Sequence, residues 1–289
     1  MGVQAGINIF SVHEQLGSDY YGTLEKVSAM GYENIELIGF NMKKMTRFSD
    51  EFPAASVKTK LRELGLTAIA AHEGTMPGQD LLSHDWDSVM KYYEALGCET
   101  IVLPSLFVKD REQTLTAAEQ MNAVGKRLKE NGFRFYLHNH AHEFKASGEV
   151  TLFDLILENT DPDVLKFEVD LVWVMRAGMD PVTVLEKLGE RCDIVHQKDL
   201  NKQLGGPVNI FEAMQQGGDE EMDVLQAYRK YVKGSDFVDL GTGRFDFKST
   251  YARIHEMGHV RYALVENEGE SSDKFESIRN DLSVLRQYL

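Results

Sequence analysis

The chain has few residues of the kinds that mark special classes of protein. It contains two cysteines and six prolines in 289 residues, which excludes a disulfide framework and a collagen-like chain. Cys98 and Cys192 lie far apart in the sequence, a usage that favours a reducing compartment. Hydrophobic residues make up 43% and charged residues 27%, so the composition is that of an ordinary globular protein.

Basic residues and long apolar runs are also scarce. There are 31 Lys and Arg residues against 46 Asp and Glu residues, a formal net charge of −15, and this argues against binding to the phosphate backbone of a nucleic acid. Apolar runs such as residues 68–71 fall far short of a membrane span. No basic stretch followed by an apolar core opens the chain, so we expect no secretory signal. These absences predict a cytoplasmic enzyme, monomeric or homo-oligomeric, that acts on a small molecule.

One pattern recurs along the first half of the chain: an amphipathic helix, a glycine, and a short apolar run. Gly31, Gly65, Gly97 and Gly132 occupy the middle position of this pattern, 34, 32 and 35 residues apart. That spacing is about one strand-plus-helix unit. Glycine suits the left-handed residue that ends a helix, and the change of period from 3.6 to 2 indicates the following strand.

Eight strands are expected in all. They lie at residues 6–10, 34–37, 66–72, 100–103, 133–140, 165–170, 194–196 and 262–266. Eight strands that mostly alternate with helices predict an α/β fold of the (β/α)8 TIM-barrel type. A doubly wound sheet is the competing fold, but no glycine fingerprint follows the first strand. No linker interrupts residues 1–289, so we expect a single domain.

Residues 201–235 break this regular alternation. The segment is long and carries an acidic cluster at residues 219–223, which we interpret as a solvated helix start. A long excursion after a barrel strand is often a lid or a wall of the substrate site. We therefore predict an inserted, lid-like segment that covers the mouth of the barrel.

Polar residues gather where the expected strands end, which is where barrel enzymes build their active sites. They are Glu36, His72, His138, His140, Glu143, Asp170, His196, Lys198 and Glu266. Strand alternation places His138 with His140, and His196 with Lys198, on common faces. A set of two Glu, one Asp and one His is rich in oxygen, which suits Mn²⁺, Mg²⁺ or Co²⁺ and also admits Zn²⁺.

Several segments of the chain, in their order and spacing, resemble one known family. They are residues 6–12, 22–24, 31–37, 138–144, 196–199, 241–247 and 265–266, together with Asp170. Over nearly its whole length the chain resembles the sugar phosphate isomerase/epimerase-like proteins of the xylose-isomerase-like TIM barrel family, relatives of inosose dehydratase and D-tagatose 3-epimerase. The His-x-Lys-Asp pattern at residues 196–199 looks more like the dehydratase side of that family.

The resemblance implies a metal site and two proton-transferring glutamates. The implied ligands are Glu143, Asp170, His196 and Glu266, with one divalent ion for which Mn²⁺ is our first expectation. Glu268 is a rival to Glu266, because both face the same way along a strand. In the epimerases the two glutamates, here Glu143 and Glu266, exchange protons with opposite faces of the substrate.

The remaining site residues are interpreted as a catalytic base and as substrate contacts. In lyase-like relatives a histidine three residues before the first glutamate serves as base, and here that residue is His140. The predicted substrate contacts are Glu36, His72, His138, Trp173 and Lys198. Gly241 and Gly243 could cradle a phosphate, although a tight turn is the more ordinary role of such a pair.

Our main functional prediction is a metal-dependent isomerase or epimerase that moves a proton of a sugar, or of a sugar phosphate, through an enediolate. The first alternative is a lyase that expels a β-hydroxyl or glycosidic group from a keto-sugar or inosose. An apurinic endonuclease shares the barrel, but the net charge of −15 disfavours it. An inactive sugar-binding barrel is disfavoured by the intact metal set.

Overall fold

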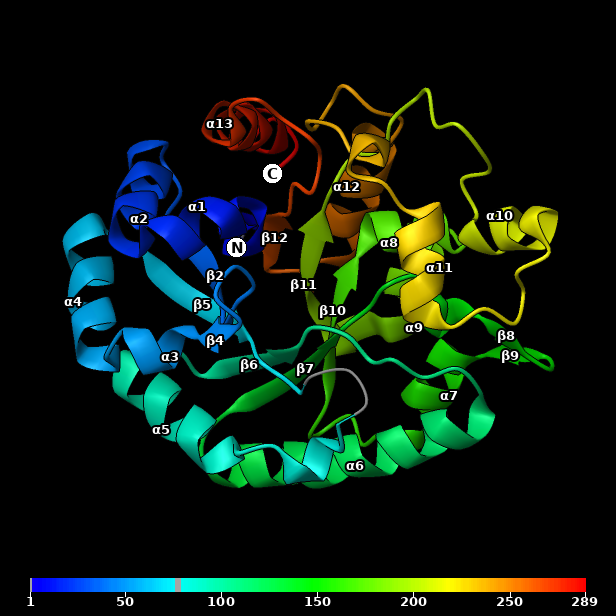
Figure 1. The fold of residues 1–289 in the computed structure, drawn as a ribbon, viewed down its shortest axis with the longest axis horizontal. Helices are drawn as coiled ribbons and strands as arrows, with labels where there is room; N and C mark the ends of the chain where they lie inside the picture. The colour runs from blue at the N-terminus through cyan, green and yellow to red at the C-terminus, as the bar shows by residue number, and fades with distance from the viewer. Residues whose placement is uncertain (1, 76–78) are drawn as a thin grey trace.

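Eight parallel strands form a closed barrel in the computed structural model, which describes residues 2–75 and 79–289 (Figure 1). Around the barrel the strands follow the order β1-β12-β11-β10-β7-β6-β5-β2. Their bounds are β1 Gln4–Asn8, β2 Asn34–Ile38, β5 Thr67–His72, β6 Thr100–Leu103, β7 Arg134–His138, β10 Lys166–Asp170, β11 Cys192–Gln197 and β12 Tyr262–Val265. The TIM-barrel prediction is therefore confirmed.

Helices pack around the outside of the barrel (Figure 1). The larger ones are α2 Tyr20–Ala29, α4 Ala54–Leu64, α5 Trp86–Leu96, α6 Arg111–Glu130, α7 Leu152–Asn159, α9 Pro181–Leu188, α12 Phe247–Met257 and α13 Lys274–Leu285. Shorter helices and hairpins decorate the loops: α1 His13–Ser18, α3 Phe48–Glu51, α8 Leu171–Arg176, β3 Phe40–Asn41 with β4 Thr46–Arg47, and β8 Ala146–Ser147 with β9 Val150–Thr151. None of the described helices is both long enough and apolar enough to cross a membrane.

Two of the expected helix ends show why glycine stands between helix and strand. Gly65 follows α4 with a φ of 67°, and Gly97 follows α5 with a φ of 94°. Both values lie in the left-handed region that other residues rarely adopt, which allows the chain to turn sharply into the next strand.

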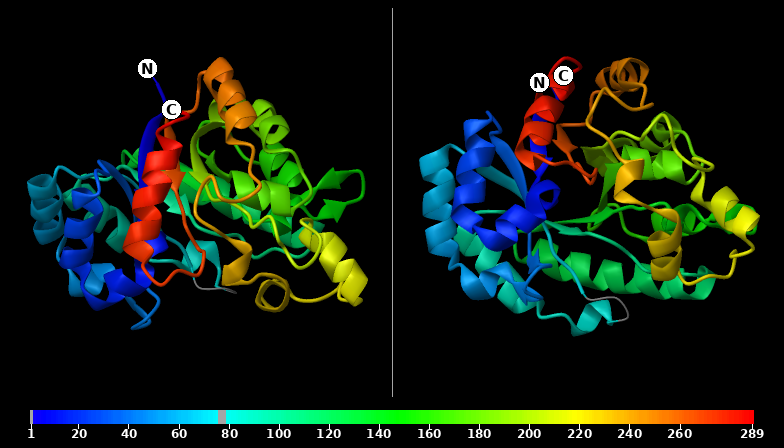
Figure 2. Two further views of the ribbon diagram at one scale, coloured as in Figure 1. Left: turned by 90° about the horizontal axis from the view of Figure 1, so that it is seen from above. Right: turned by 45° about the horizontal axis from the view of Figure 1, so that its top comes forward.

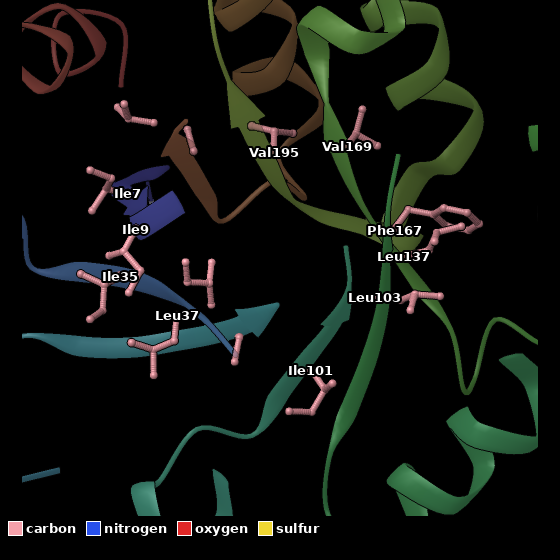
Figure 3. Packing of buried hydrophobic residues seen from close by; sticks show 14 of the residues in the cluster. Ile7, Ile9, Ile35, Leu37, Ile101, Leu103, Leu137, Phe167, Val169 and Val195 are labelled. Atoms are coloured by element: carbon pink, nitrogen blue, oxygen red, sulfur yellow. The ribbon is translucent and has the colours of Figure 1, made fainter. Parts of the chain in front are cut away.

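Each strand of the barrel sends alternate side chains outward and inward. The outward ones, such as Ile35, Leu137 and Val195, are buried against the helices (Figure 3). A smaller apolar cluster that includes Val102 and Leu264 fills the interior of the barrel. The hydrophobic core therefore has two parts, one between the barrel and the surrounding helices and a smaller one inside the barrel. The polar site lies at the carboxyl ends of the strands, next to the inner part.

Among the strand boundaries that differ from the sequence prediction, two bear on the site. The first strand ends at Asn8 rather than at residue 10, because the Asn8 side chain accepts a hydrogen bond from the Phe10 N–H at 2.7 Å and caps a short 3-10 turn. Strand β7 ends at His138, so His140 lies in the loop beyond the strand.

The segment 201–235 leaves the barrel after β11 and returns close to its starting point. It contains α10 (Ile210–Gly217) and α11 (Val224–Tyr231), which lie on the same side of the molecule as α8 (Figures 1 and 2). At its base the N–H of Asn201 donates to the carbonyl of Asp236 at 2.7 Å. This bond ties the two ends of the excursion together.

The two ends of the chain also meet. Helix α13 lies against β1 in both views of Figure 2. The hydroxyl of Tyr32 donates a hydrogen bond to the carbonyl of Ile278 at 2.7 Å. The last helix thus closes the barrel next to the first strand.

Candidate active site

The polar site is formed by inward-facing positions at the carboxyl ends of the strands. Strand register pairs Glu168 of β10 with His138 of β7, and Asp170 of β10 with His196 of β11. Each of these four side chains is at most 2% exposed. Because parallel strands end at the same edge of the barrel, residues distant in sequence converge there.

Three imidazoles surround the carboxylate of Glu168. Its Oε1 lies 2.9 Å from His72 Nε2, 3.0 Å from His138 Nδ1 and 2.9 Å from His196 Nε2. Its Oε2 is buried and has no hydrogen-bond partner within residues 2–75 and 79–289. Burial opposes ionisation, but the charge on His196 and the hydrogen bonds of the imidazoles hold the pKa of Glu168 well below its usual value.

Glu36 brings a second carboxylate to the same cluster. Its Oε2 lies 2.6 Å from His196 Nε2 and accepts a hydrogen bond from the Asn8 amide at 2.7 Å. Its Oε1 is buried and has no hydrogen-bond partner in the part of the chain that the structure describes. Burial and the neighbouring charge of Glu168 raise the pKa of Glu36 to about 7. Burial opposes protonation of His196, but Glu168, Glu36 and Glu266 hold the pKa of its imidazole well above the usual value.

Lys198 organises the other side of the site. Its ammonium lies 2.9 Å from Asp170 and 3.1 Å from Glu268, and it also forms an ion pair with Glu266. Burial opposes protonation, but the three carboxylates raise the pKa of Lys198 above its usual value. Glu266 in turn contacts His196 Nδ1 at 2.6 Å, so this group adjoins the Glu168 cluster.

Among the described residues, two overlapping groups of side chains could hold a metal ion. One is His72, His138, Glu168 and His196; the other is His138, Asp170, His196 and Glu266. Within each group the potential ligand atoms all lie within 4.8 Å of one another. Both groups contain more nitrogen ligands than the set expected from the sequence, which had a single histidine.

The structure brings three of the four expected metal ligands together. Asp170, His196 and Glu266 lie in one group, whereas Glu143 lies outside both. Glu143 follows the strand by five residues, and its carboxylate is held by the His140 N–H at 2.9 Å and lies 3.2 Å from His142 Nε2. The side chain is fully buried, and burial raises its pKa. Glu143 therefore does not lie with the other three residues, and its role as a metal ligand stays a prediction.

His140 and Trp173 form an aromatic wall beside the second metal group. Their ring centroids are 5.3 Å apart, and the His140 ring also lies 5.3 Å from His138. His140 Nδ1 and Trp173 Nε1 are both buried without hydrogen-bond partners in the described chain. Burial lowers the pKa of His140 well below its usual value, and the neighbouring His138, His142 and Lys198 lower it further. The His140 ring is therefore a neutral imidazole with a free nitrogen.

The excursion adds a residue to this wall that the sequence analysis did not single out. Tyr228 of α11 packs edge-on against Trp173 at 5.3 Å, and its hydroxyl oxygen accepts the N–H groups of Ala141 and His142 at 3.0 and 3.3 Å. His142 Nε2 must donate to the Leu106 carbonyl at 2.6 Å, so its Nδ1 is free to accept the Tyr228 hydroxyl proton. The segment 201–235 is thus hydrogen-bonded to the loop after β7 at residues 141–142.

The N–H groups of Gly241 and Gly243, considered above as a phosphate cradle, instead donate to the side chain of Asp199. The Asp199 carboxylate accepts hydrogen bonds from four backbone N–H groups, and Asp199 itself is 1% exposed. A Cβ at residue 243 would lie 2.1 Å from the Asp199 carboxylate, so the close approach requires glycine there. The N–H groups of Gly241 and Gly243 therefore bind the Asp199 carboxylate.

The principal site residues missed by the sequence analysis are Glu168 and Asn8. Glu168 lies two residues before Asp170 on the same strand, so alternation alone places both on the inner face. Glu168 lies two residues before the end of its strand, whereas the polar residues predicted for the site lie at the strand ends or beyond them.

The chain belongs to the xylose isomerase-like TIM barrel family, whose model matches residues 24–288. The resemblance inferred from the sequence is therefore confirmed. An inosose dehydratase of Clostridium perfringens is 26% identical over 170 residues, which are 59% of this chain and 52% of that protein. The chain thus spans about half the length of the curated relatives it matches.

Solved structures with low sequence identity share the fold. A sugar phosphate isomerase/epimerase from Parabacteroides distasonis is 20% identical, with a TM-score of 0.73 over 98% of this chain and 93% of that one. The IolI protein, solved with a bound zinc atom, is 13% identical, with a TM-score of 0.72 over 99% of both chains. Together with the family model, these matches show that the chain has the fold of the xylose isomerase-like TIM barrels.

Proposed function

We propose that the protein is a metal-assisted lyase that eliminates a β-hydroxyl or glycosidic group from a keto-sugar or inosose. The observation that carries the proposal is a cluster of buried imidazoles and carboxylates beside a neutral histidine with a free nitrogen. The inosose dehydratases among its relatives are lyases by name, and they favour elimination over the isomerase or epimerase activity expected first from the sequence.

The Glu168 group is the site we propose for the metal. Lys198 already supplies a positive charge to Asp170 and Glu266, whereas Glu36 and Glu168 are offset only by imidazoles. Unpartnered oxygens on Glu36 and Glu168 are what a cation would satisfy. A divalent ion held there would act as a Lewis acid toward the substrate carbonyl oxygen. Three imidazoles and a carboxylate suit Zn²⁺ or Co²⁺ at least as well as the Mn²⁺ expected first.

His140 is the base we propose. Its Nδ1 would accept the proton from the carbon next to the carbonyl, and the electron pair would pass to the carbonyl oxygen. The electrons then return as the bond from the β-carbon to its oxygen breaks. The imidazolium gives the proton to that leaving oxygen, so water or an alcohol departs and no further reactant is needed.

Glu143 and Glu266 remain candidates for proton transfer in the isomerase alternative. Epimerisation needs two groups that reach opposite faces of one carbon. Glu143 is fully buried and held by the His140 N–H, while Glu266 is paired with Lys198 and His196. Glu266 would have to leave its present partners to act as a base. Glu143 Oε1, like His140 Nδ1, has no hydrogen-bond partner among the described residues, but the other oxygen of Glu143 is held by the His140 N–H.

Analysis of the products separates the two activities. The metal-loaded protein is incubated with an inosose, and the products are identified by NMR and mass spectrometry. We expect loss of one water with formation of a conjugated product, and we expect chelation to abolish it. Recovery of an isomer with unchanged mass would contradict the lyase proposal and support the isomerase alternative.

A further inference from the structure

Asp199 occupies an anion cradle at the mouth of the barrel. Its Oδ2 accepts the N–H groups of Gly241 and Gly243, both at 2.9 Å, and its Oδ1 accepts those of Phe245 at 3.0 Å and Leu200 at 2.8 Å. These four N–H groups come from Leu200 and from alternate residues of the segment 241–245, and backbone N–H groups that converge on one anion are a means by which other proteins bind phosphate.

The cradle lies in a part of the fold where TIM-barrel enzymes frequently bind phosphate. Asp199 comes two residues after β11, the seventh strand of the barrel, and the cradle closes just before α12. In TIM-barrel enzymes a substrate phosphate is frequently held by backbone groups of the loops after the seventh and eighth strands. Here the amides of the loop after the seventh strand are already used by a carboxylate of the same chain. Because that carboxylate is tethered, a free phosphate would compete against a very high effective concentration.

The cationic side chains near this loop are engaged as well. Arg244 donates to the carbonyl oxygens of Asn201 and Lys202 at 3.1 and 2.7 Å. Lys198 is surrounded by three carboxylates. Arg244 and Lys198 are therefore already engaged by oxygen atoms of the same chain.

A neighbouring cavity does not supply an alternative phosphate site. It has a volume of about 500 Å³ and is lined by Glu14, Glu268 and Glu270 as well as by Lys233 and Lys274. Lys233 donates to the Arg229 carbonyl at 3.0 Å, and Lys274 donates to the Gly269 carbonyl at 2.6 Å. The three carboxylates would repel a phosphate dianion, while hydroxyl groups could bind to both kinds of lining residue.

We propose that the substrate is an uncharged polyhydroxy ketone rather than a sugar phosphate, because Asp199 fills the place that a substrate phosphate would take. That the substrate is a ketone rests on the proposed function. That it has no phosphate group rests on the Asp199 cradle alone and does not depend on the reaction. Removal of the Asp199 carboxylate should turn the cradle into a phosphate site.

The test uses inorganic phosphate as the probe and three proteins: wild type, Asp199→Ala and Asp199→Asn. Thermal unfolding is followed with increasing phosphate at constant ionic strength. We expect no saturable effect on the wild type, a lowered Tm for Asp199→Ala that phosphate raises in a saturable way, and little response from Asp199→Asn, whose amide still fills the cradle. A folded Asp199→Ala that does not respond, or a saturable response of the wild type, overturns the proposal.

A titration of the wild type decides the question if Asp199→Ala does not fold. Calorimetry compares fructose with fructose 6-phosphate on the metal-loaded protein. We expect the phosphate group to add nothing to the affinity, and an affinity at least tenfold higher for the phosphate ester would overturn the proposal. Neither readout requires turnover, so failure of the lyase assay leaves this result standing, and the reverse also holds.

Discussion

The ammonium of Lys198 lies 2.9 Å from the Asp170 carboxylate, and both side chains are at most 1% exposed. Because Lys198 is on one side of the site, the buried carboxylates on the two sides have different neighbours. Asp170 and Glu266 have a fixed cation beside them, whereas Glu168 and Glu36 have only imidazoles. A metal ion would therefore add most to the half that contains Glu168.

The first prediction concerns the metal ligands. Glu168→Ala and His196→Ala should lose most of their bound divalent cation, because each removes a ligand from a group of four. Glu143→Gln is the matched control, since it changes a buried carboxylate outside both groups, and it should retain the ion. Metal content is measured by elemental analysis after gel filtration. Equal metal in Glu168→Ala and Glu143→Gln would show that the site is wrongly placed.

The second prediction concerns Lys198. Lys198→Met should destabilise the metal-free protein by about 3–5 kcal/mol, because it leaves buried carboxylates without their cation. Added divalent cation should recover part of this loss, since a metal ion can then neutralise the same carboxylates. Urea unfolding with and without cation measures both effects. A variant as stable as wild type without metal would refute the charge assignment.

The third prediction tests whether residues 201–235 form a lid fastened by Tyr228. Tyr228→Phe keeps the ring but removes the acceptor for two backbone N–H groups, a change that costs about 1–3 kcal/mol. Limited proteolysis should therefore cut this segment several-fold faster in the variant, and an active substrate should slow the cut in the wild type. Unchanged cleavage rates would argue that the segment is a fixed wall.

The fourth prediction uses Asp281, a buried carboxyl away from the proposed metal ligands. Burial raises its pKa from 3.8 to about 7, although hydrogen bonds from Asn267 and Leu240 oppose the shift. Between pH 4 and pH 7 the folded state then holds a proton that the unfolded state gives up, so the stability contributed by Asp281 falls as the pH rises. Relative to Asp281→Asn, the wild type should lose about 4 kcal/mol of unfolding free energy from pH 4 to pH 8. Parallel pH profiles for the two proteins would contradict the shift.

The sequence was sufficient to predict the barrel because each of its units repeats a local pattern. Glycines after helices and short apolar runs located the strands to within a few residues. The end of the first strand was misplaced because a side chain decides it: the Asn8 cap converts an apolar run into a 3-10 turn. Hydrophobic periodicity contains no information about such a cap.

The site was harder to predict because it depends on depth within the barrel as well as on direction. Glu143 follows β7 closely in sequence, but the loop turns its carboxylate back toward the His140 N–H. Glu168 faces inward by simple alternation and could have been found by counting two residues back from Asp170. Tyr228 could not have been found in this way, because it arrives from an excursion whose docking is set by tertiary packing.

The most direct test of the account is hydrogen exchange at the carbon next to the carbonyl. An inosose is incubated in D₂O with metal-loaded wild type, with His140→Ala and with chelated wild type, and deuterium incorporation is measured by NMR. We predict incorporation by the wild type, a loss of about two orders of magnitude in His140→Ala, and none after chelation. Rapid exchange by His140→Ala, together with its loss in Glu143→Gln or Glu266→Gln, would contradict the histidine base and return the protein to the two-glutamate isomerase mechanism.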